Sequence, residues 1–265
     1  MRKDFYIEFY NNIELILDKY IKRASLQYFF KTIFFEKTYN LKYSYNEDRL
    51  NGNSEQQCYS KLETRLLSLL PTKDFITRIS KGIKLKDPIN PKISFYKNSL
   101  IFYIYNNRLL DYLLPIIKEI NRPTILLLEP GIYEEIEVPE WIVALEIDYE
   151  LIQSDEELNY KNDSLIKGLY FKLLVNEILK IIHPDGLVFL EGCHYQEKIA
   201  AYLGKELQIP TICIQHGWQS FRHSMFSDME YDFFLTWGKG FSIEMKKYFP
   251  NTELCARGLH QFIQQ

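Results

Sequence analysis

The chain has 265 residues, of which 46% are hydrophobic and 15% are aromatic, and its formal net charge is -3. This composition supports a large buried core and excludes an intrinsically disordered chain. Acidic and basic side chains are mixed along the sequence, so no basic field indicates nucleic acid as a partner. The four cysteines form no CxxC pair, which argues against a disulfide framework or a zinc knuckle. We therefore expect a globular, cytoplasmic protein.

Residues 1–86 predict a mainly helical region. Apolar residues recur every three or four positions from Phe5 to Ala24, the period of an amphipathic helix, and a second helix is predicted from Leu26 to Lys37. The polar, asparagine-rich segment from Tyr39 to Gln57 is typical of a loop, and helical spacing returns from Ser60 to Leu70. No segment has the length and apolar purity of a membrane span. The aromatic side chains of these helices are candidates for contact with a partner subunit or with the inner face of a membrane.

Residues 87–265 predict a Rossmann-like doubly wound parallel sheet of about seven strands. The segment DPINP, Asp87 to Pro91, marks the boundary with its two prolines. Beyond it, short apolar runs alternate with helical segments, as in parallel sheets covered by helices on both faces. The predicted strands are LIFYIYN (Leu100 to Asn106), TILLLE (Thr124 to Glu129), WIVALEI (Trp141 to Ile147), LVFLEG (Leu187 to Gly192), TICIQ (Thr211 to Gln215), FFLTWG (Phe233 to Gly238) and ELCARG (Glu253 to Gly258).

The predicted strands end in glycines and polar side chains at one edge of the sheet. Ligands bind outside the carboxyl ends of such strands, because helix N-termini and connecting loops converge there. Glu129 and Pro130 follow the second strand, and Cys193 follows the fourth. The residues that we expect to bind substrate at this edge are Gly131, Gly192, His194, Gln215, Gly217, Trp218, Trp237 and Gly238.

Two residues at this edge are predicted to be catalytic. His216 ends the fifth strand, and an imidazole with a pKa near neutrality can accept a proton or donate a hydrogen bond to a phosphate. Glu191 is the first carboxylate candidate for a general base, because it ends the strand before; Asp148 is a second candidate. An ordinary turn is the alternative interpretation of both His216 and the segment from Glu191 to His194.

The sequence predicts neither a metal nor a bound cofactor. The chain contains no GxGxxG fingerprint and no Walker loop. Its histidines and nearby carboxylates match no familiar zinc spacing. Ser220 and Ser224 lie in no GxSxG elbow, so a serine nucleophile is not indicated.

Two stretches carry a resemblance to a known family. They are PDGLVFLEGCHYQEKIAAYLGKELQIPTICIQHGWQS, from Pro184 to Ser220, and DFFLTWGKGFSIEMKKYFPNTELCARG, from Asp232 to Gly258. Both resemble the acceptor-side half of GT-B glycosyltransferases. The resemblance is strongest to the enzymes of bacterial surface-carbohydrate and capsule assembly and to the glycerophosphate polymerases of teichoic acid synthesis. The shared pattern is a helix ending in "gIPt", a strand ending in "QHG", a "WG" after the next strand, and a strand leading to "tGnp".

This resemblance implies transfer of a sugar or polyol phosphate from a nucleotide donor to a carbohydrate acceptor, usually without a structural metal. It implies that His216 faces a cleft between two Rossmann domains and that Gly258 begins the linker to the second. Here GLHQ replaces the usual Gly-Asn-Pro, and the chain stops at Gln265. We therefore expect the second domain, which holds most of the nucleotide contacts, to be absent. The chain is then the first part of a longer enzyme, the partner of a separate domain, or inactive.

Two other functions remain open. A non-catalytic binding or assembly module of a glycan-synthesis complex would use the aromatic N-terminal helices to dock another subunit. A sugar-nucleotide epimerase shares the strand, the helix and the "IPt" layout. It usually carries Gly-Asp where this chain has Gly192 and Cys193.

Overall fold

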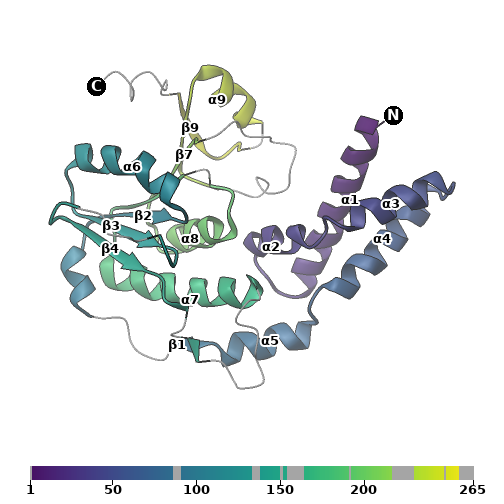
Figure 1. Ribbon diagram of the computed structural model, residues 1–265, viewed down its shortest axis with the longest axis horizontal. Helices are drawn as coiled ribbons and strands as arrows, with labels where there is room; N and C mark the ends of the chain where they lie inside the picture. Colours follow the sequence, from purple (N-terminus) through teal and green to yellow (C-terminus); the bar gives the residue numbers. More distant parts are fainter. Residues whose placement is uncertain are drawn as a thin grey trace.

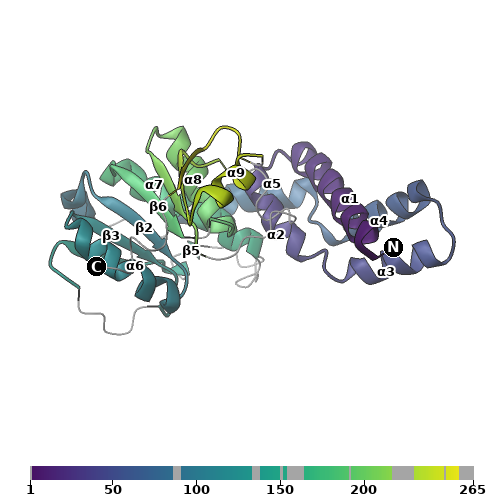
Figure 2. The same cartoon turned by 90° about the horizontal axis from the view of Figure 1, so that it is seen from above.

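The computed structural model describes residues 2–85, 91–132, 138–149, 152–153, 164–190, 192–216, 230–247 and 249–256. A helical N-terminal region lies beside an α/β domain (Figure 1). Viewed at right angles, α1, α3 and α4 extend away from the α/β domain, and α2 and α5 lie nearest to it (Figure 2). The predicted fold class, an α/β protein with a parallel sheet preceded by a helical region, is confirmed.

The helical region is built from short helices with local start signals. Ser54 begins α4 with a capping box: its Oγ accepts from the Gln57 N–H, and the Gln57 side chain accepts from the Ser54 N–H. Thr72 caps α5 in the same way by accepting from the Phe75 N–H. The elements are α1 (Arg2–Arg23), η1 (Tyr28–Phe30), α2 (Lys31–Glu36), α3 (Leu41–Leu50), α4 (Glu55–Leu69) and α5 (Lys73–Gly82).

The prediction of a loop from Tyr39 to Gln57 is wrong, because helix α3 occupies most of this segment. Tyr45 of this helix is fully buried, and its hydroxyl donates to the Glu8 carboxylate and accepts from the Asn12 amide of α1. Asp48 is buried against Lys61 and Arg65 of α4. These contacts with two neighbouring helices outweigh the weak helix propensity of the segment.

The α/β domain contains one wholly parallel sheet of seven strands in the order β4-β3-β2-β6-β7-β8-β9. A separate antiparallel pair joins β1 (Lys84–Leu85) to β5 (Ile152–Gln153). The strands of the main sheet are β2 (Leu100–Ile104), β3 (Thr124–Leu128), β4 (Ile142–Glu146), β6 (Gly186–Leu190), β7 (Thr211–Ile214), β8 (Phe233–Thr236) and β9 (Glu253–Ala256). Each predicted strand is thus confirmed within a few residues.

Helices cover both faces of this sheet. Successive side chains of β2 alternate between them: Ile101 and Tyr103 pack in the core that also contains α7 and α8, whereas Phe102 and Ile104 pack against α6. The helices are α6 (Asn107–Ile120), α7 (Ser164–Ile182), α8 (Tyr195–Glu206) and α9 (Lys239–Lys246). In the described part of the chain, no helix has both the length and the apolar character needed to cross a bilayer.

Candidate functional site

The strand order reverses between β2 and β6. From β2 the chain proceeds outward to β3 and β4, and it then returns to place β6 on the other side of β2. The connections that leave β2 and β6 lead to helices on opposite faces of the sheet. In doubly wound folds this divergence typically opens a crevice at the carboxyl edge. This switch point is where ligands bind in doubly wound folds, and it is therefore the centre of the candidate site.

Tyr105 and His194 meet at the switch point. Tyr105 follows β2, and His194 stands directly before α8. Their ring centroids are 4.0 Å apart, with the ring planes inclined by 50°. Both side chains are only partly buried. The structure thus brings the predicted His194 to the switch point and adds Tyr105, which sequence reasoning missed because the order of strands cannot be derived from the sequence.

A buried network fixes the backbone beside His194. The Glu197 carboxylate accepts hydrogen bonds from the N–H groups of Gly192, at 3.2 Å, and of His194, at 3.1 Å. The Tyr231 hydroxyl donates to the Gly192 carbonyl oxygen at 2.9 Å. Gly192 has a φ of 71°, and a Cβ there would lie 2.5 Å from the Cys213 Sγ. The glycine is therefore required by the turn and by close packing of the backbone on β7.

The strand end of β7 delivers His216 to the same edge. Its ring contacts the edge of Tyr112, on α6, at a centroid distance of 5.2 Å and an interplanar angle of 81°. Burial raises the pKa of Tyr112, which therefore stays a neutral hydroxyl at physiological pH. The carboxyl edge thus carries two pairs that each join a tyrosine to a histidine: Tyr105 with His194, and Tyr112 with His216.

Gln215 joins two loops of this edge. Its side chain is fully buried, and its amide oxygen accepts from the Trp237 N–H at 2.9 Å. The Trp237 indole Nε1–H in turn donates to the Gln215 carbonyl oxygen at 2.8 Å. These bonds hold the Trp237 ring beside β7, where it also contacts Phe241 at a centroid distance of 5.8 Å. Gln215 therefore positions Trp237 in addition to preceding His216.

Glu129 directly follows β3, the strand that pairs with β2 on the side away from β6. Its Oε1 accepts hydrogen bonds from the hydroxyls of Tyr103, at 2.7 Å, and Tyr149, at 2.9 Å. Burial raises the pKa of this carboxyl above its ordinary value, although the two tyrosine hydroxyls act in the opposite direction. A carboxylate whose pKa is raised above its ordinary value is a stronger base than an ordinary glutamate, which suits it to accept a proton. The sequence placed Glu129 at this edge but gave no reason to prefer it as a base.

The Glu129 cluster is continuous with the switch point. The Tyr103 ring lies 6.2 Å from that of Tyr105, which contacts His194. The ammonium of Lys167 lies 5.7 Å from the centre of the Tyr149 ring, and its positive charge favours the ionised form of Glu129. One row of side chains therefore runs from β3 across β2 to the N-terminus of α8.

The remaining predicted residues divide into two groups. Gly131 has a φ of 79° and donates its N–H to Glu146, and both Gly131 and Gly238 leave open space where a side chain would be. Asp148, the second candidate base, is exposed at the end of β4. Glu191, Gly217 and Trp218 lie outside the described residues, so their predicted roles stay predictions.

The described residues contain no candidate metal centre. Among the residues that the structure describes, no group of three or more histidine, cysteine, aspartate or glutamate side chains could hold a metal ion. No disulfide joins the four cysteines, of which Cys58, Cys193 and Cys213 are buried and Cys255 is partly buried. Among the described residues, the side chains at the switch point thus supply imidazoles, tyrosine hydroxyls and the Glu129 carboxylate.

Comparison with known protein families found no match to this chain, and comparison with curated proteins found none either.

Proposed function

We propose that the α/β domain is the acceptor-side domain of a glycosyltransferase that moves a sugar or polyol phosphate from a nucleotide donor to a surface carbohydrate. The observation that carries the proposal is the switch point, where the Tyr105–His194 and Tyr112–His216 pairs lie at the carboxyl edge of the sheet. Aromatic rings offer flat apolar surfaces to sugar rings, and imidazoles and hydroxyls supply the few polar groups that orient a ligand. The resemblance of the segment around QHG to GT-B enzymes supports the same assignment.

The reaction needs a proton acceptor and a stabiliser of negative charge. An acceptor hydroxyl must lose its proton as it attacks, and the leaving nucleotide phosphate gains charge as its bond to the transferred group breaks. We assign proton removal to Glu129, whose pKa is raised by burial. We assign His216 to a hydrogen bond with the phosphate. Glu191, as the alternative base, belongs to the same proposal.

The donor nucleotide is expected to be held mainly by a further domain or a separate partner, as in GT-B enzymes generally. On this proposal the chain alone binds an acceptor glycan but transfers little. Steady hydrolysis or transfer by the chain alone, on mixing it with nucleotide sugars, would contradict this division of labour.

The test is a titration of the protein with a panel of oligosaccharides and polyol-phosphate oligomers, followed by NMR of the histidine side chains and by calorimetry. We expect one class of glycan to shift the signals of His194 and His216. His216→Asn should weaken its binding about 10-fold, the effect of losing one good polar contact.

His183→Asn is the matched control. His183 is exposed and lies just before β6, at the opposite edge of the sheet, and asparagine tolerates its left-handed φ of 46°. This variant should bind as the wild type does. If no glycan bound, or if both variants weakened binding equally, the proposed function would be wrong.

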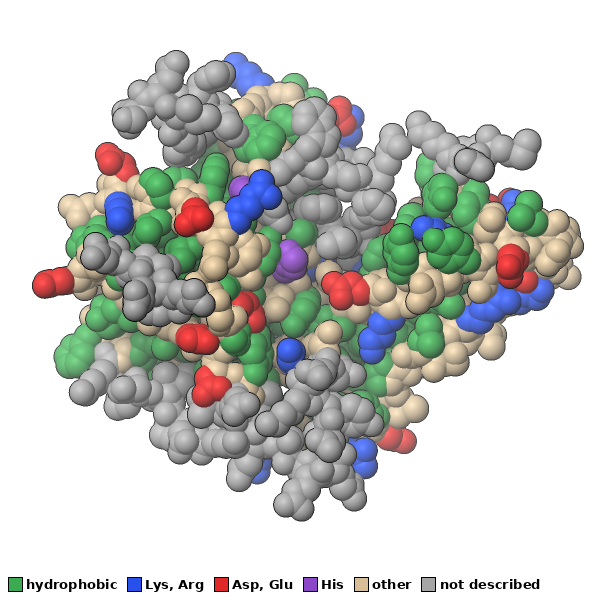
Figure 3. All heavy atoms as spheres, in the orientation of Figure 1, with side chains coloured by type: hydrophobic (Ala, Val, Ile, Leu, Met, Phe, Trp, Pro, Cys, Tyr) green, Lys and Arg blue, Asp and Glu red, His purple; other side chains and the backbone are tan. Residues whose placement is uncertain are grey.

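A second candidate function, docking of another subunit, is favoured by an aromatic patch on the helical region. Tyr39 and Tyr43 are 60% and 62% exposed, Tyr6 is 44% exposed, and the Lys42 ammonium lies 4.5–5.7 Å from their ring centres. Hydrophobic side chains are visible on this part of the surface (Figure 3). Light scattering of the wild type and of a Tyr39→Ser, Tyr43→Ser variant distinguishes the two candidates. A wild-type dimer that dissociates in the variant would support docking of another subunit. If both proteins were monomers, the docking function would be rejected and the transferase function would be retained.

A further inference from the structure

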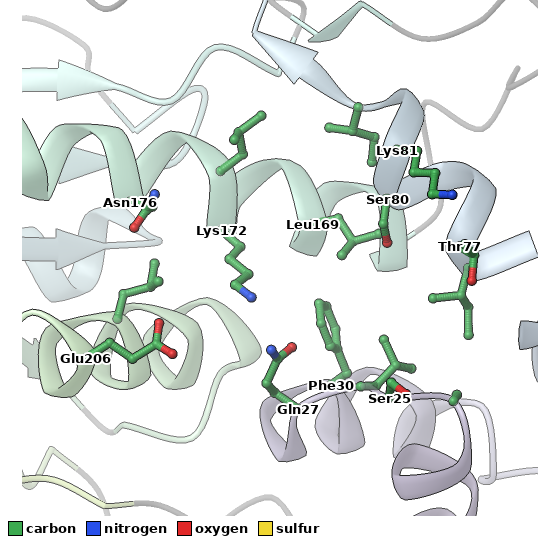
Figure 4. Close-up of a pocket in the computed structure, with 16 residues that line it drawn as sticks. Ser25, Gln27, Phe30, Thr77, Ser80, Lys81, Leu169, Lys172, Asn176 and Glu206 are labelled. Atoms are coloured by element: carbon green, nitrogen blue, oxygen red, sulfur yellow. The ribbon is translucent and has the colours of Figure 1, made fainter.

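A cavity of about 630 Å³ is lined by residues of both the helical region and the α/β domain. Its walls come from the connection that follows α1, from η1, from α5, from the middle of α7 and from the C-terminal end of α8 (Figure 4). This volume falls within the range of about 300–1,000 Å³ that is usual for small-molecule sites. The carboxyl edge described above contacts the other end of α8, so this cavity is distinct from the candidate transfer site.

The Lys172 ammonium points into this cavity, toward Gln27 and Glu206 (Figure 4). The side chain is half-buried, and its ammonium lies 5.8 Å and 5.9 Å from the ring centres of Phe29 and Tyr202. Within the described part of the chain, no carboxylate comes within salt-bridge distance of it. Burial accordingly lowers the pKa of Lys172, and the charge of Glu206 offsets this only in part.

An unpaired cation inside a cavity is unfavourable unless an anion reaches it. Partial removal from water costs the ammonium solvation free energy, and a bound anion would recover it through charge-assisted hydrogen bonds. The two aromatic rings beside the ammonium contribute cation–π attraction but no hydrogen-bond acceptor. The three ammonium hydrogens therefore remain available to a ligand.

The rest of the lining indicates what else the ligand carries. Ser25, Thr77 and Ser80 present hydroxyls, and Figure 4 shows their side chains around the same space as Lys172. Lys81 adds a second ammonium on the exposed α5 side. Apolar contact is provided by Phe30 and Leu169. A small molecule with one anionic group and several hydroxyls would satisfy all three kinds of surface.

We propose that this cavity binds a small phosphorylated polyol of the sugar phosphate class, with its phosphate on Lys172 and its hydroxyls toward α5. The site is independent of the proposed transferase reaction. Because its walls come from both parts of the molecule, the ligand holds the helical region and the α/β domain together. Binding should therefore raise the thermal stability of the whole chain.

The experiment is a set of thermal unfolding curves with a hexose 6-phosphate, the neutral hexose and inorganic phosphate as probes. We expect the hexose 6-phosphate to raise Tm with a saturable dependence on concentration, and the other two to do so far more weakly. In Lys172→Met the affinity should fall about 10- to 100-fold, the usual loss for a hydrogen bond to a charged group.

Lys180→Met is the matched control, since Lys180 lies on the same helix, is exposed and pairs only with Glu177 in the described structure. This variant should keep the full response. Each variant is compared with its own unliganded Tm, so an effect on folding is separated from an effect on binding. If Lys172→Met did not fold, Lys81→Met would take its place and should weaken binding by a smaller factor.

Three results would overturn the proposal: no response to any probe, an equal response to neutral hexose or inorganic phosphate, or an unchanged response in Lys172→Met. The variant His216→Asn should respond to the hexose 6-phosphate as the wild type does. Failure of this inference therefore has no bearing on the proposed transferase function, and the reverse is also true.

Discussion

Gly192 lies in a closely packed part of the switch point, and a substitution there measures how much this packing contributes to stability. An alanine there must adopt a φ of 71°, and its Cβ would lie 2.5 Å from the Cys213 Sγ and 3.0 Å from the Tyr231 hydroxyl. We expect Gly192→Ala to lower the free energy of unfolding by about 2–4 kcal/mol, from backbone strain and overpacking together. Gly131→Ala is the matched control, since Gly131 has a similar φ of 79° and open space around it. Urea unfolding of both variants should show the smaller loss, about 1 kcal/mol, at Gly131; equal losses would mean that the close packing at Gly192 is unimportant.

Glu129 makes a prediction about pH. Burial raises its pKa in the folded protein, so the folded state holds this proton more tightly than the unfolded chain does. Its stabilising contribution is complete below the ordinary pKa of glutamate and is lost as the pH rises through the raised value. The stability of the wild type relative to Glu129→Gln should therefore fall as the pH rises above the ordinary pKa of glutamate, about 4.3. Urea unfolding of both proteins at a series of pH values from the ordinary glutamate pKa upward measures this fall. A difference between wild type and Glu129→Gln that stays constant with pH would contradict the raised pKa.

Gly192 and Glu129 show which features of a single residue can be predicted from the sequence and which cannot. Gly192 was predictable, because a glycine that follows an apolar run and precedes a helical segment marks a strand-to-helix turn. The environment of Glu129 was not, because it is created by Tyr103 on a neighbouring strand and by Tyr149 after another. Burial and hydrogen-bond partners from other elements set its pKa, and none of them is encoded near residue 129.

At the scale of a single element, we predict how much the buried hydrogen bonds at the start of α8 contribute to stability. Glu197 is fully buried and accepts from the N–H groups of Gly192 and His194, so it satisfies donors that the helix itself leaves unpaired. Glu197→Ala should cost about 1–3 kcal/mol of unfolding free energy, because buried donors lose their acceptor. Gln57→Ala removes the equivalent side chain from the exposed capping box of α4 and should cost at most about 1 kcal/mol. Unfolding monitored by circular dichroism gives both values, and the reverse order would show that burial of the network adds nothing.

Elements were predicted well where one pattern dominated. The strands of the sheet are continuous apolar runs, because both of their faces are covered, and such runs remain visible in the sequence. Helix α3 was not predicted, because its asparagines and acidic residues favour turns. Its stability depends instead on the contacts that Tyr45 makes with α1 and Asp48 makes with α4. A helix stabilised mainly by tertiary contacts carries a weak signal in its own sequence. The pairing of β2 with β6, which defines the candidate site, also leaves no local signal in the sequence.

At the scale of the whole molecule, the helical region and the α/β domain share one core. Buried side chains of α1, α2, α4 and α5 form a continuous cluster with those between the sheet and the layer of α7 and α8. Phe30 lies within it: a Cβ on Gly168 of α7 would be 3.1 Å from the Phe30 ring. Two parts of a chain that are joined by a continuous apolar core are expected to unfold together, since neither can separate without exposing it to water.

Phe30→Ala tests this coupling. Removing the fully buried ring should cost about 3–5 kcal/mol of unfolding free energy. All three tryptophans lie after residue 140, so tryptophan fluorescence reports the α/β domain, whereas circular dichroism also reports the helical region. If the core is shared, the mutation in the helical region lowers both denaturation midpoints equally. Phe95→Ala, at a ring that is 84% exposed, should move neither. A loss of helical signal that precedes the fluorescence change would show two independently folding parts, and the cavity between them would then open and close with their separation.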